Sequence, residues 1–276
     1  MRRFVGRFWQ FFWLGLWAAA VMAAAIRGEA AAIRGEAAEV GPPTPPRVAI
    51  LDTGLDVTDK RFRVCGWHDA TKTGITDDHG HGTHVAGIIT ALGEKAPCLL
   101  VCKYYLDSAP GSVNLARTIE CLRWAISKKA DYINYSGGGP EASHDELLAL
   151  RVARSAGVEV VVAAGNDHED IDLSENHYYP ASYLLPGMHV VGGIEDYGKR
   201  TSTSNYGSAI TDMALGDDLF SSLPNGKSGY MSGTSQATAI VTGGLIRQRL
   251  GLEPISRHDA RCYLLRYWKP TDFKCP

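Results

Sequence analysis

The sequence lacks an excess of charge of either sign. Its 28 lysines and arginines stand against 30 aspartates and glutamates, so the formal net charge of the 276 residues is -2. Without a basic excess, binding through general attraction to phosphates is not expected, and we predict no nucleic-acid partner. Low-complexity disorder is excluded for the chain as a whole, because 45% of the residues are hydrophobic and can build a core.

Two protease signatures are missing or incomplete. No H-E-x-x-H sequence occurs, so the usual helical zinc site of a metalloprotease is excluded. The tripeptide D-T-G occurs at Asp52–Gly54, and no second D-T-G or D-S-G follows it. An aspartic protease needs two aspartates that share a proton. That mechanism would require a symmetric dimer of this chain, and we do not favour it.

Residues 1–25 have the features of a targeting segment. Arginines occur among the first seven residues, and residues 8–25 are apolar apart from one glutamine and end in Ala23, Ala24 and Ala25. This pattern predicts a secretory signal peptide and an exported protein, secreted or periplasmic. The apolar run is close to the lower limit for a membrane span, so an uncleaved signal anchor that tethers the protein through residues 8–25 is the alternative.

Residues 26–46 have the composition of a linker. The pentapeptide Ile26–Ala30 recurs as Ile33–Ala37, and the proline-rich stretch Gly41–Pro46 follows. Two copies are too few for a solenoid or a coiled coil. Because proline-rich sequence forms a stiff spacer, we expect the folded domain to span residues 47–276.

Within that domain, short apolar runs alternate with patterns of helical length. Strands are predicted at Val48–Leu51, Leu99–Lys103, Tyr132–Tyr135, Val158–Ala164 and His189–Gly192. Helices are predicted at Thr83–Leu92, Val113–Lys128, Asp145–Ser155 and Ser235–Leu250. The alternation predicts an α/β fold, a three-layer αβα sandwich with a mostly parallel, doubly wound sheet. Ligands of such sheets bind beyond the carboxyl ends of the strands, so we expect the site residues there.

Three polar residues lie at the ends of predicted elements: Asp52 follows a strand, His81 precedes a helix and Ser235 opens one. Each has an ordinary explanation as a turn residue, a polar cap or a helix N-cap. His79, His81 and His84 could also bind a metal, but their spacing does not match the usual zinc pattern, so we predict no metal site. The positive end of the helix dipole is expected to help keep His81 a neutral base.

Taken together, Asp52, His81 and Ser235 are the residue types of a catalytic triad. The serine attacks, the histidine takes and returns its proton, and the buried acid orients the ring. The chain order Asp, His, Ser is that of one known triad. The apolar run Val160–Gly165 would deliver Asn166 to the same edge of the sheet. Its amide and the backbone N–H of Ser235 would then form an oxyanion hole.

At these residues the sequence resembles the subtilisin-like serine proteases, the subtilase family. The segments that carry the resemblance, between about Val48 and Leu265, are Ala49–Gly54, His81–Gly87, Ile133–Pro140, Tyr179–Ala181, Thr203–Gly207 and Gly233–Ser235. The resemblance implies a subtilisin-like fold and a serine endopeptidase that hydrolyses peptide bonds of extended polypeptides. It also implies that His81, and not His84, is the base.

Ser136–Gly139 is expected to pair with the substrate backbone, because it resembles the segment that does so in the family. Its glycines let an extended peptide approach and add as a strand, although a flexible loop is the alternative. Substrate contacts are therefore predicted at Ser136, Gly137, Gly138, Gly165 and Tyr178. Tyr178 falls where the family often has a glycine at the back of the specificity pocket, so we expect a narrowed pocket that favours small side chains.

The chain departs from the family's pattern elsewhere. Ala239 stands where a proline is usual, four residues after the serine, and Leu215 lies near another expected proline. The stretch between Gly87 and Cys98 is too short for the tight calcium loop of some members, so we expect no required cofactor. The acidic loop Asp167–His177 could bind calcium weakly, but a solvated charged loop is the favoured interpretation.

Secreted subtilases usually carry a folded pro-domain. The residues between Ala25 and Arg47 leave room only for a linker of low complexity, so we expect no pro-domain in this chain. We expect a monomer that acts on a polypeptide substrate. Either its core folds unaided or a separate folding helper or inhibitor assists it.

The six cysteines could form disulfides in an oxidising compartment. Cys98 and Cys102 are expected on one strand about 13 Å apart, at ~3.3 Å per residue, which is too far for them to pair with each other. Six reduced, buried cysteines are the alternative. We predict three pairs: Cys65 with Cys98, Cys102 with Cys121, and Cys262 with Cys275. Each bridge would stabilise the trimmed core by about 2–4 kcal/mol.

Overall fold

The structure is a computed structural model that describes residues 44–269. The predicted targeting segment, the repeat and most of the proline-rich linker lie outside these residues, so the signal peptide and the membrane tether stay predictions. Contacts group the described residues from Pro45 onward into one unit, close to the predicted domain start at Arg47. Within the described part of the chain, no helix is long and apolar enough to cross a membrane.

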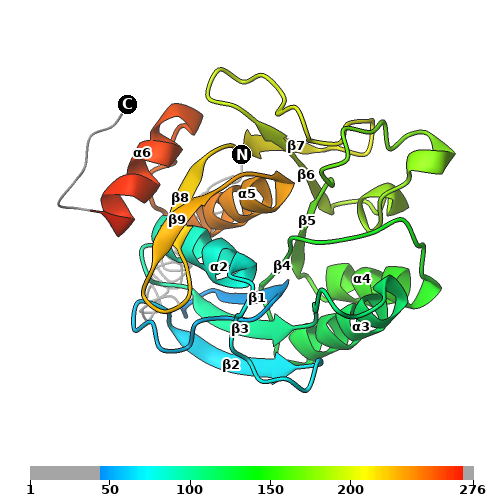
Figure 1. The fold of residues 1–276 in the computed structure, drawn as a ribbon, viewed down its shortest axis with the longest axis horizontal. Helices are drawn as coiled ribbons and strands as arrows, with labels where there is room; N and C mark the ends of the chain where they lie inside the picture. Colours follow the sequence, from blue (N-terminus) through cyan, green and yellow to red (C-terminus); the bar gives the residue numbers. More distant parts are fainter. Residues whose placement is uncertain (1–43, 270–276) are drawn as a thin grey trace, which may run out of the picture. The chain divides into compact units, whose positions relative to one another are not determined.

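A parallel sheet with the strand order β2-β3-β1-β4-β5-β6-β7 forms the centre of this unit (Figure 1). Its strands are β1 Arg47–Asp52, β2 Val64–Asp69, β3 Cys98–Lys103, β4 Tyr132–Tyr135, β5 Glu159–Ala163, β6 His189–Ile194 and β7 Asp212–Leu215. The chain places β2 and β3 on one side of β1 and β4 to β7 on the other. The sheet is therefore doubly wound, as predicted, and loops diverge at the carboxyl end of β1.

Helices cover both faces of the sheet (Figure 1). Their bounds are α2 His81–Leu92, α3 Gly111–Ser127, α4 His144–Ser155, α5 Thr234–Arg249 and α6 Arg257–Trp268, with short 3-10 turns η1 Ser174–Asn176 and η2 Ala181–Tyr183. Val48 and Ile50 of β1 are buried in the core with α2 and α5. Ala49 and Leu51 are buried in the core with α3 and α4. This alternation confirms the predicted three-layer sandwich.

The five predicted strands and the four predicted helices are present with ends within two residues of the predicted ones. The prediction missed the edge strands β2 and β7, the helix α6, and a separate antiparallel hairpin of β8 Leu219–Ser222 and β9 Ser228–Met231. Residues of β2 are partly buried or exposed and those of the first half of β7 are partly buried, so these strands have no continuous apolar run.

Two of the three predicted disulfides are present. Cys65 is bonded to Cys98, which joins β2 to β3, and Cys102 is bonded to Cys121, which joins β3 to α3. Cys275 lies outside the described residues, so the third pairing stays a prediction.

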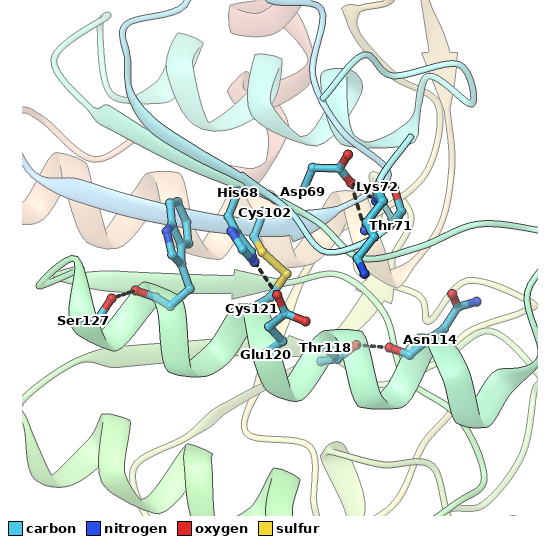
Figure 2. The surroundings of a disulfide bond; sticks show 11 residues. His68, Asp69, Thr71, Lys72, Cys102, Asn114, Thr118, Glu120, Cys121 and Ser127 are labelled. Carbon is cyan, nitrogen blue, oxygen red and sulfur yellow. Dashed lines mark hydrogen bonds and ion pairs between the residues drawn. A yellow bond between two sulfur atoms is a disulfide. The ribbon is translucent and has the colours of Figure 1, made fainter. Parts of the chain in front are cut away.

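The second disulfide fixes α3 against the sheet next to the site (Figure 2). Glu120 of α3 faces His68 of β2 across it, with 2.6 Å between the carboxylate and the ring nitrogen Nε2. Towards the start of α3, the Thr118 hydroxyl donates to the Asn114 carbonyl oxygen at 3.0 Å. Asn114 and Thr118 both line the cavity at the carboxyl edge of the sheet.

Candidate active site

The four predicted catalytic residues line one cavity of about 490 Å³. Of the predicted substrate contacts, Ser136, Gly137, Gly138 and Tyr178 line it too, and Gly165 does not. Asp52 is the last residue of β1, and His81 is the first residue of α2. Ser235 is the second residue of α5, and Asn166 follows the end of β5 by three residues. Because parallel strands end at one edge of a sheet, residues far apart in the sequence meet there.

Asp52 and His81 are in hydrogen-bond contact in the cavity. The carboxylate oxygen Oδ1 lies 2.7 Å from Nδ1 of the ring and also accepts the backbone N–H of Thr53 at 2.8 Å. Burial lowers the pKa of His81, but the charge and hydrogen bond of Asp52 and the charge of Asp77 outweigh it, so the pKa lies above its usual value. The expectation from the helix dipole, a ring held neutral, was therefore wrong in its net direction.

Asp77, which was not predicted from the sequence, links the end of the strand that carries Asp52 to the helix that carries His81. Its Oδ1 accepts the hydroxyl of Thr53 and the N–H of Gly80, both at 2.8 Å, and its Oδ2 accepts the N–H of Thr83 at 2.7 Å. The Thr53 hydroxyl oxygen in turn accepts the N–H of Gly82 at 2.9 Å. The end of β1 and the first turn of α2 are thus joined through one buried carboxylate.

His84 has a structural role. Its Nε2 lies 3.0 Å from the Leu219 carbonyl oxygen and 3.3 Å from that of Gly229, so it ties α2 to the β8–β9 hairpin. Burial lowers its pKa to about 4, and the ring is neutral at physiological pH. Among the residues that the structure describes, no three side chains of metal-binding type are grouped as a metal site.

Ser235 lies at the end of a buried chain of hydrogen bonds. Its hydroxyl donates to the Ser136 carbonyl oxygen at 3.0 Å, and the Ser136 hydroxyl donates to the Ser235 carbonyl oxygen at 3.1 Å. Behind them, Asn134 donates to the Ser136 hydroxyl at 2.9 Å, and Thr242 donates to the Asn134 amide oxygen at 2.8 Å. These bonds fix the start of α5 against the end of β4.

Asn166 has its amide orientation fixed by the backbone of α5. Its Oδ1 accepts the N–H of Thr234 at 2.9 Å. The oxygen is thus engaged by the backbone, and Asn166 and Ser235 both line the cavity. A pair of N–H donors at such a place can stabilise an oxyanion.

Tyr178 fills the slot between two of the predicted glycine contacts. A Cβ atom on Gly138 would lie 2.5 Å from the Tyr178 ring, and one on Gly165 would lie 3.0 Å from it. Gly139 and Tyr179 then pair as antiparallel neighbours, with N–H to carbonyl distances of 2.9 and 2.8 Å. The structure therefore places Tyr178 in close contact with the glycine wall, where only residues without a side chain fit.

The opposite wall comes from Tyr104, Tyr105 and the first turns of α3. A Cβ on Gly137 would lie 2.1 Å from the Tyr104 hydroxyl, so this tyrosine reaches across to the Ser136–Gly139 segment. Glu146 of α4 also lines the cavity and was not predicted. Burial raises its pKa to about 6, against the opposing effect of hydrogen bonds from nearby tyrosines.

The acidic loop 167–177 is held by hydrogen bonds within it and to Ser208. Asp172 accepts the backbone N–H of Ser208 at 2.9 and 2.8 Å and its hydroxyl at 2.9 Å, and Asp170 accepts the N–H of Asp172 at 3.1 Å. These carboxylates thus have partners within the loop region. Weak calcium binding there stays a prediction.

Comparison with known sequences gives matches across most of the described chain. The sequence model of the subtilase family matches residues 45–266. Subtilisin amylosacchariticus of Bacillus subtilis subsp. amylosacchariticus is 36% identical over 207 residues, which are 71% of this chain and 53% of that protein. The chain thus spans about half the length of this curated relative.

Comparison with solved structures gives the same fold. A cold adapted subtilisin-like serine proteinase matches with a TM-score of 0.64 and 26% identity, covering 80% of this chain and 79% of that one. The self-cleaved protease domain of PatA matches with a TM-score of 0.62 and 27% identity, covering 76% of this chain and 84% of that one.

Proposed function

The chain belongs to the subtilase family, and on that premise we propose that it is a serine endopeptidase that hydrolyses peptide bonds of extended polypeptides. The observation that carries the proposal is the 2.7 Å contact between Asp52 and His81 in the cavity that Ser235 and Asn166 also line. An acid, a base, a nucleophile and an oxyanion donor are the groups that acyl transfer requires.

The proposed reaction begins when the Ser235 hydroxyl turns from the Ser136 carbonyl towards His81. Its oxygen attacks the substrate carbonyl carbon while Nε2 of the ring takes the proton. The Nδ1–H stays hydrogen-bonded to Asp52, whose charge stabilises the imidazolium. Asn166 and the Ser235 N–H stabilise the oxyanion. The C–N bond then breaks, the leaving amine takes the proton from Nε2, and water hydrolyses the acyl-enzyme by the same route.

Labelling with a fluorophosphonate tests this assignment directly. The reagent phosphonylates an activated serine, so we expect labelling of the wild-type protein, located by peptide mapping at Ser235, and none of Ser235→Ala. Equal labelling of the two proteins, or a label located at another residue, would be incompatible with Ser235 as the nucleophile.

Asn166→Ala is expected to lower kcat by about 10²–10³-fold with little change in KM, because its amide acts on charge that develops only in the transition state. Steady-state kinetics on a peptide substrate measures this. Asn166→Asp is the matched control, since it can keep the oxygen that accepts the Thr234 N–H but removes the donors. If Asn166→Asp restored kcat, the contact with Thr234 and not the oxyanion would explain the loss.

Tyr178→Gly is expected to broaden cleavage towards large aromatic side chains. Removing the ring opens the slot between Gly138 and Gly165, and filling such a slot with an aromatic side chain favours binding by about tenfold or more. Cleavage profiles on a peptide library give the measurement. Tyr178→Phe keeps the ring and should keep the wild-type preference for small side chains. An unchanged cleavage profile in Tyr178→Gly would contradict a pocket narrowed by Tyr178.

We also propose that the protein is exported, secreted or periplasmic. The two described disulfides support this, because disulfides persist in oxidising compartments. A monomeric state, independence from a required cofactor, and a separate folding helper or inhibitor complete the proposal.

A further inference from the structure

Glu146 is a buried acid that the proposed reaction does not use. Its side chain is 1% exposed, yet it lines the cavity. Its Oε2 accepts the Tyr183 hydroxyl at 2.8 Å, and the Tyr135 hydroxyl is also directed at the carboxyl group. Among the described residues, Oε1 has no partner with hydrogen-bond geometry. A buried carboxylate with a free acceptor can be completed by a donor that enters from the cavity.

The cavity has no fixed positive charge to complete it. Its described lining includes the carboxylates of Asp52, Glu141 and Glu146 and no lysine or arginine. Two further carboxylates interact with the lining tyrosines: Asp107 accepts a hydrogen bond from Tyr105, and the charge of Asp167 acts on Tyr178. A cleft with charge of one sign attracts a ligand of the opposite sign.

The walls next to Glu146 are aromatic. The rings of Tyr104 and Tyr135 meet edge to face with centroids 5.8 Å apart, and Tyr105 packs against Tyr104 at 6.0 Å. Aromatic faces and phenol oxygens both interact favourably with a cationic side chain, and its methylene stem can pack on the rings. Tyr104, Tyr135 and Glu146 thus line the same cavity, which combines aromatic rings with a buried acid.

We propose that Glu146 determines substrate specificity by accepting a lysine or arginine side chain that enters the cavity. The inference rests on the proposed peptidase function and names its substrate class, a polypeptide with a basic residue near the scissile bond. The cation supplies the positive charge that no lysine or arginine of the described cavity lining provides for the Glu146 carboxylate. A buried acid without a neighbouring positive charge costs folding free energy, because its charge is desolvated and unpaired. Such acids are typical of functional sites.

A lysine scan tests the proposal. Peptides carry one lysine, or uncharged norleucine, which keeps the four-carbon stem without the ammonium group, at each position around the scissile bond in turn. We expect wild-type kcat/KM to favour lysine over norleucine by at least about tenfold at one position, as for a desolvated charge pair. Binding of the same peptides to Ser235→Ala, followed by fluorescence anisotropy, should show the same preference. No preference at any position in either assay would overturn the proposal.

Glu146→Leu should abolish the preference for lysine at that position and leave the other positions unchanged. Asp145→Asn is the matched control, because it removes the same charge from an exposed neighbour on α4 and should keep the preference. Glu146→Leu is expected to fold, since the Tyr183 hydroxyl keeps its bonds to the Ser143 backbone. A Glu146→Leu protein that labels with fluorophosphonate and still prefers lysine would contradict the role of Glu146. Lysine-selective binding without hydrolysis would instead contradict the peptidase function alone.

The pH dependence gives a readout that a merely structural role would not change. The titratable groups that face Glu146 are Tyr183 of η2, Tyr135 of β4, and Tyr104 and Tyr178 of the cavity walls, and burial raises the pKa of each. They stay neutral, so Glu146, with its pKa of about 6, is the group that titrates. The lysine-to-norleucine ratio should be full at pH 8 and fall as the pH drops through about 6. The loss of the base when His81 is protonated slows hydrolysis of both peptides and cancels in the ratio.

Discussion

Ser235→Ala is expected to lower kcat for peptide hydrolysis by about 10⁶-fold, the size of loss that follows when a triad nucleophile is removed. The substitution deletes the atom that attacks and leaves the other groups of the cavity in place. Residual hydrolysis above the uncatalysed rate is expected, because Asn166 and the backbone N–H at position 235 still stabilise the oxyanion. Active-site titration and steady-state kinetics with a fluorogenic peptide measure both effects.

The fold of Ser235→Ala should be intact. The lost hydroxyl donates one hydrogen bond, to the Ser136 carbonyl, while the bonds from Ser136, Asn134 and Thr242 that fix this region remain. A net change of about 1 kcal/mol in the free energy of unfolding is expected. Ser127→Ala, at the end of α3 and far along the sequence from these groups, is the matched control and should keep the wild-type kcat. A Ser235→Ala protein with near wild-type kcat would exclude the serine mechanism.

The sequence predicted the interior of the fold better than its margins. Runs such as Val160–Val162 are buried on both faces and therefore continuous in apolar character. The edge strand β2 alternates partly buried and exposed residues and contains Gly66, so no such run marks it. In α6 the buried residues Ala260, Leu264 and Trp268 recur every four residues between charged ones. This apolar stripe is narrower than that of a typical amphipathic helix, so the sequence pattern did not predict α6.

The positions of Asp52, His81, Ser235 and Asn166 were predictable because a motif coincides at each with the end of a strand or the start of a helix. The direction of the His81 pKa shift was not predictable from these motifs. Burial lowers the pKa of His81, and Asp52 and, to a smaller extent, Asp77 raise it. Asp77 is distant from Asp52 in the sequence, and the two are linked through their shared contact with Thr53. A helix terminus considered without its neighbours therefore gave the wrong sign.

Glu146 shows how a local pattern can hide a site residue. Ser143 and Glu146 have the spacing of a capping box, in which the glutamate would turn back to the serine N–H at the helix start. The Ser143 hydroxyl does accept the Glu146 N–H at 3.3 Å. Its own N–H, however, donates to the Tyr183 hydroxyl at 2.7 Å, and the carboxylate turns inward. Tyr183 of η2 thus accepts the hydrogen bond that Glu146 would accept in a capping box, and the Glu146 carboxylate lines the cavity instead.

Asp52→Asn is expected to lower kcat by about 10⁴-fold at the pH of the wild-type optimum. Oδ1 of Asp52 accepts both the Thr53 N–H and the His81 ring. An asparagine that keeps its oxygen there loses the charge that stabilises the imidazolium. One that turns its NH₂ to Nδ1 places the ring proton on Nε2, where it blocks transfer from the serine. Either orientation impairs the base.

The pH profile of Asp52→Asn distinguishes this mechanism from a general loss of structure. His81 must be neutral to take the proton, so activity falls as the pH drops through its pKa. In the wild type burial lowers that pKa, but Asp52 and, to a smaller extent, Asp77 raise it above the usual value. Without the Asp52 charge, the lowering of the His81 pKa by burial is opposed less strongly. The acid limb of the kcat/KM profile for the residual activity should therefore move to lower pH. Thr53→Val, which removes a hydroxyl bonded to Asp77, perturbs the same loop but leaves the Asp52 charge in place. It should slow the enzyme without a comparable shift, and equal shifts in the two variants would show that the acid limb reports the loop and not the charge on Asp52.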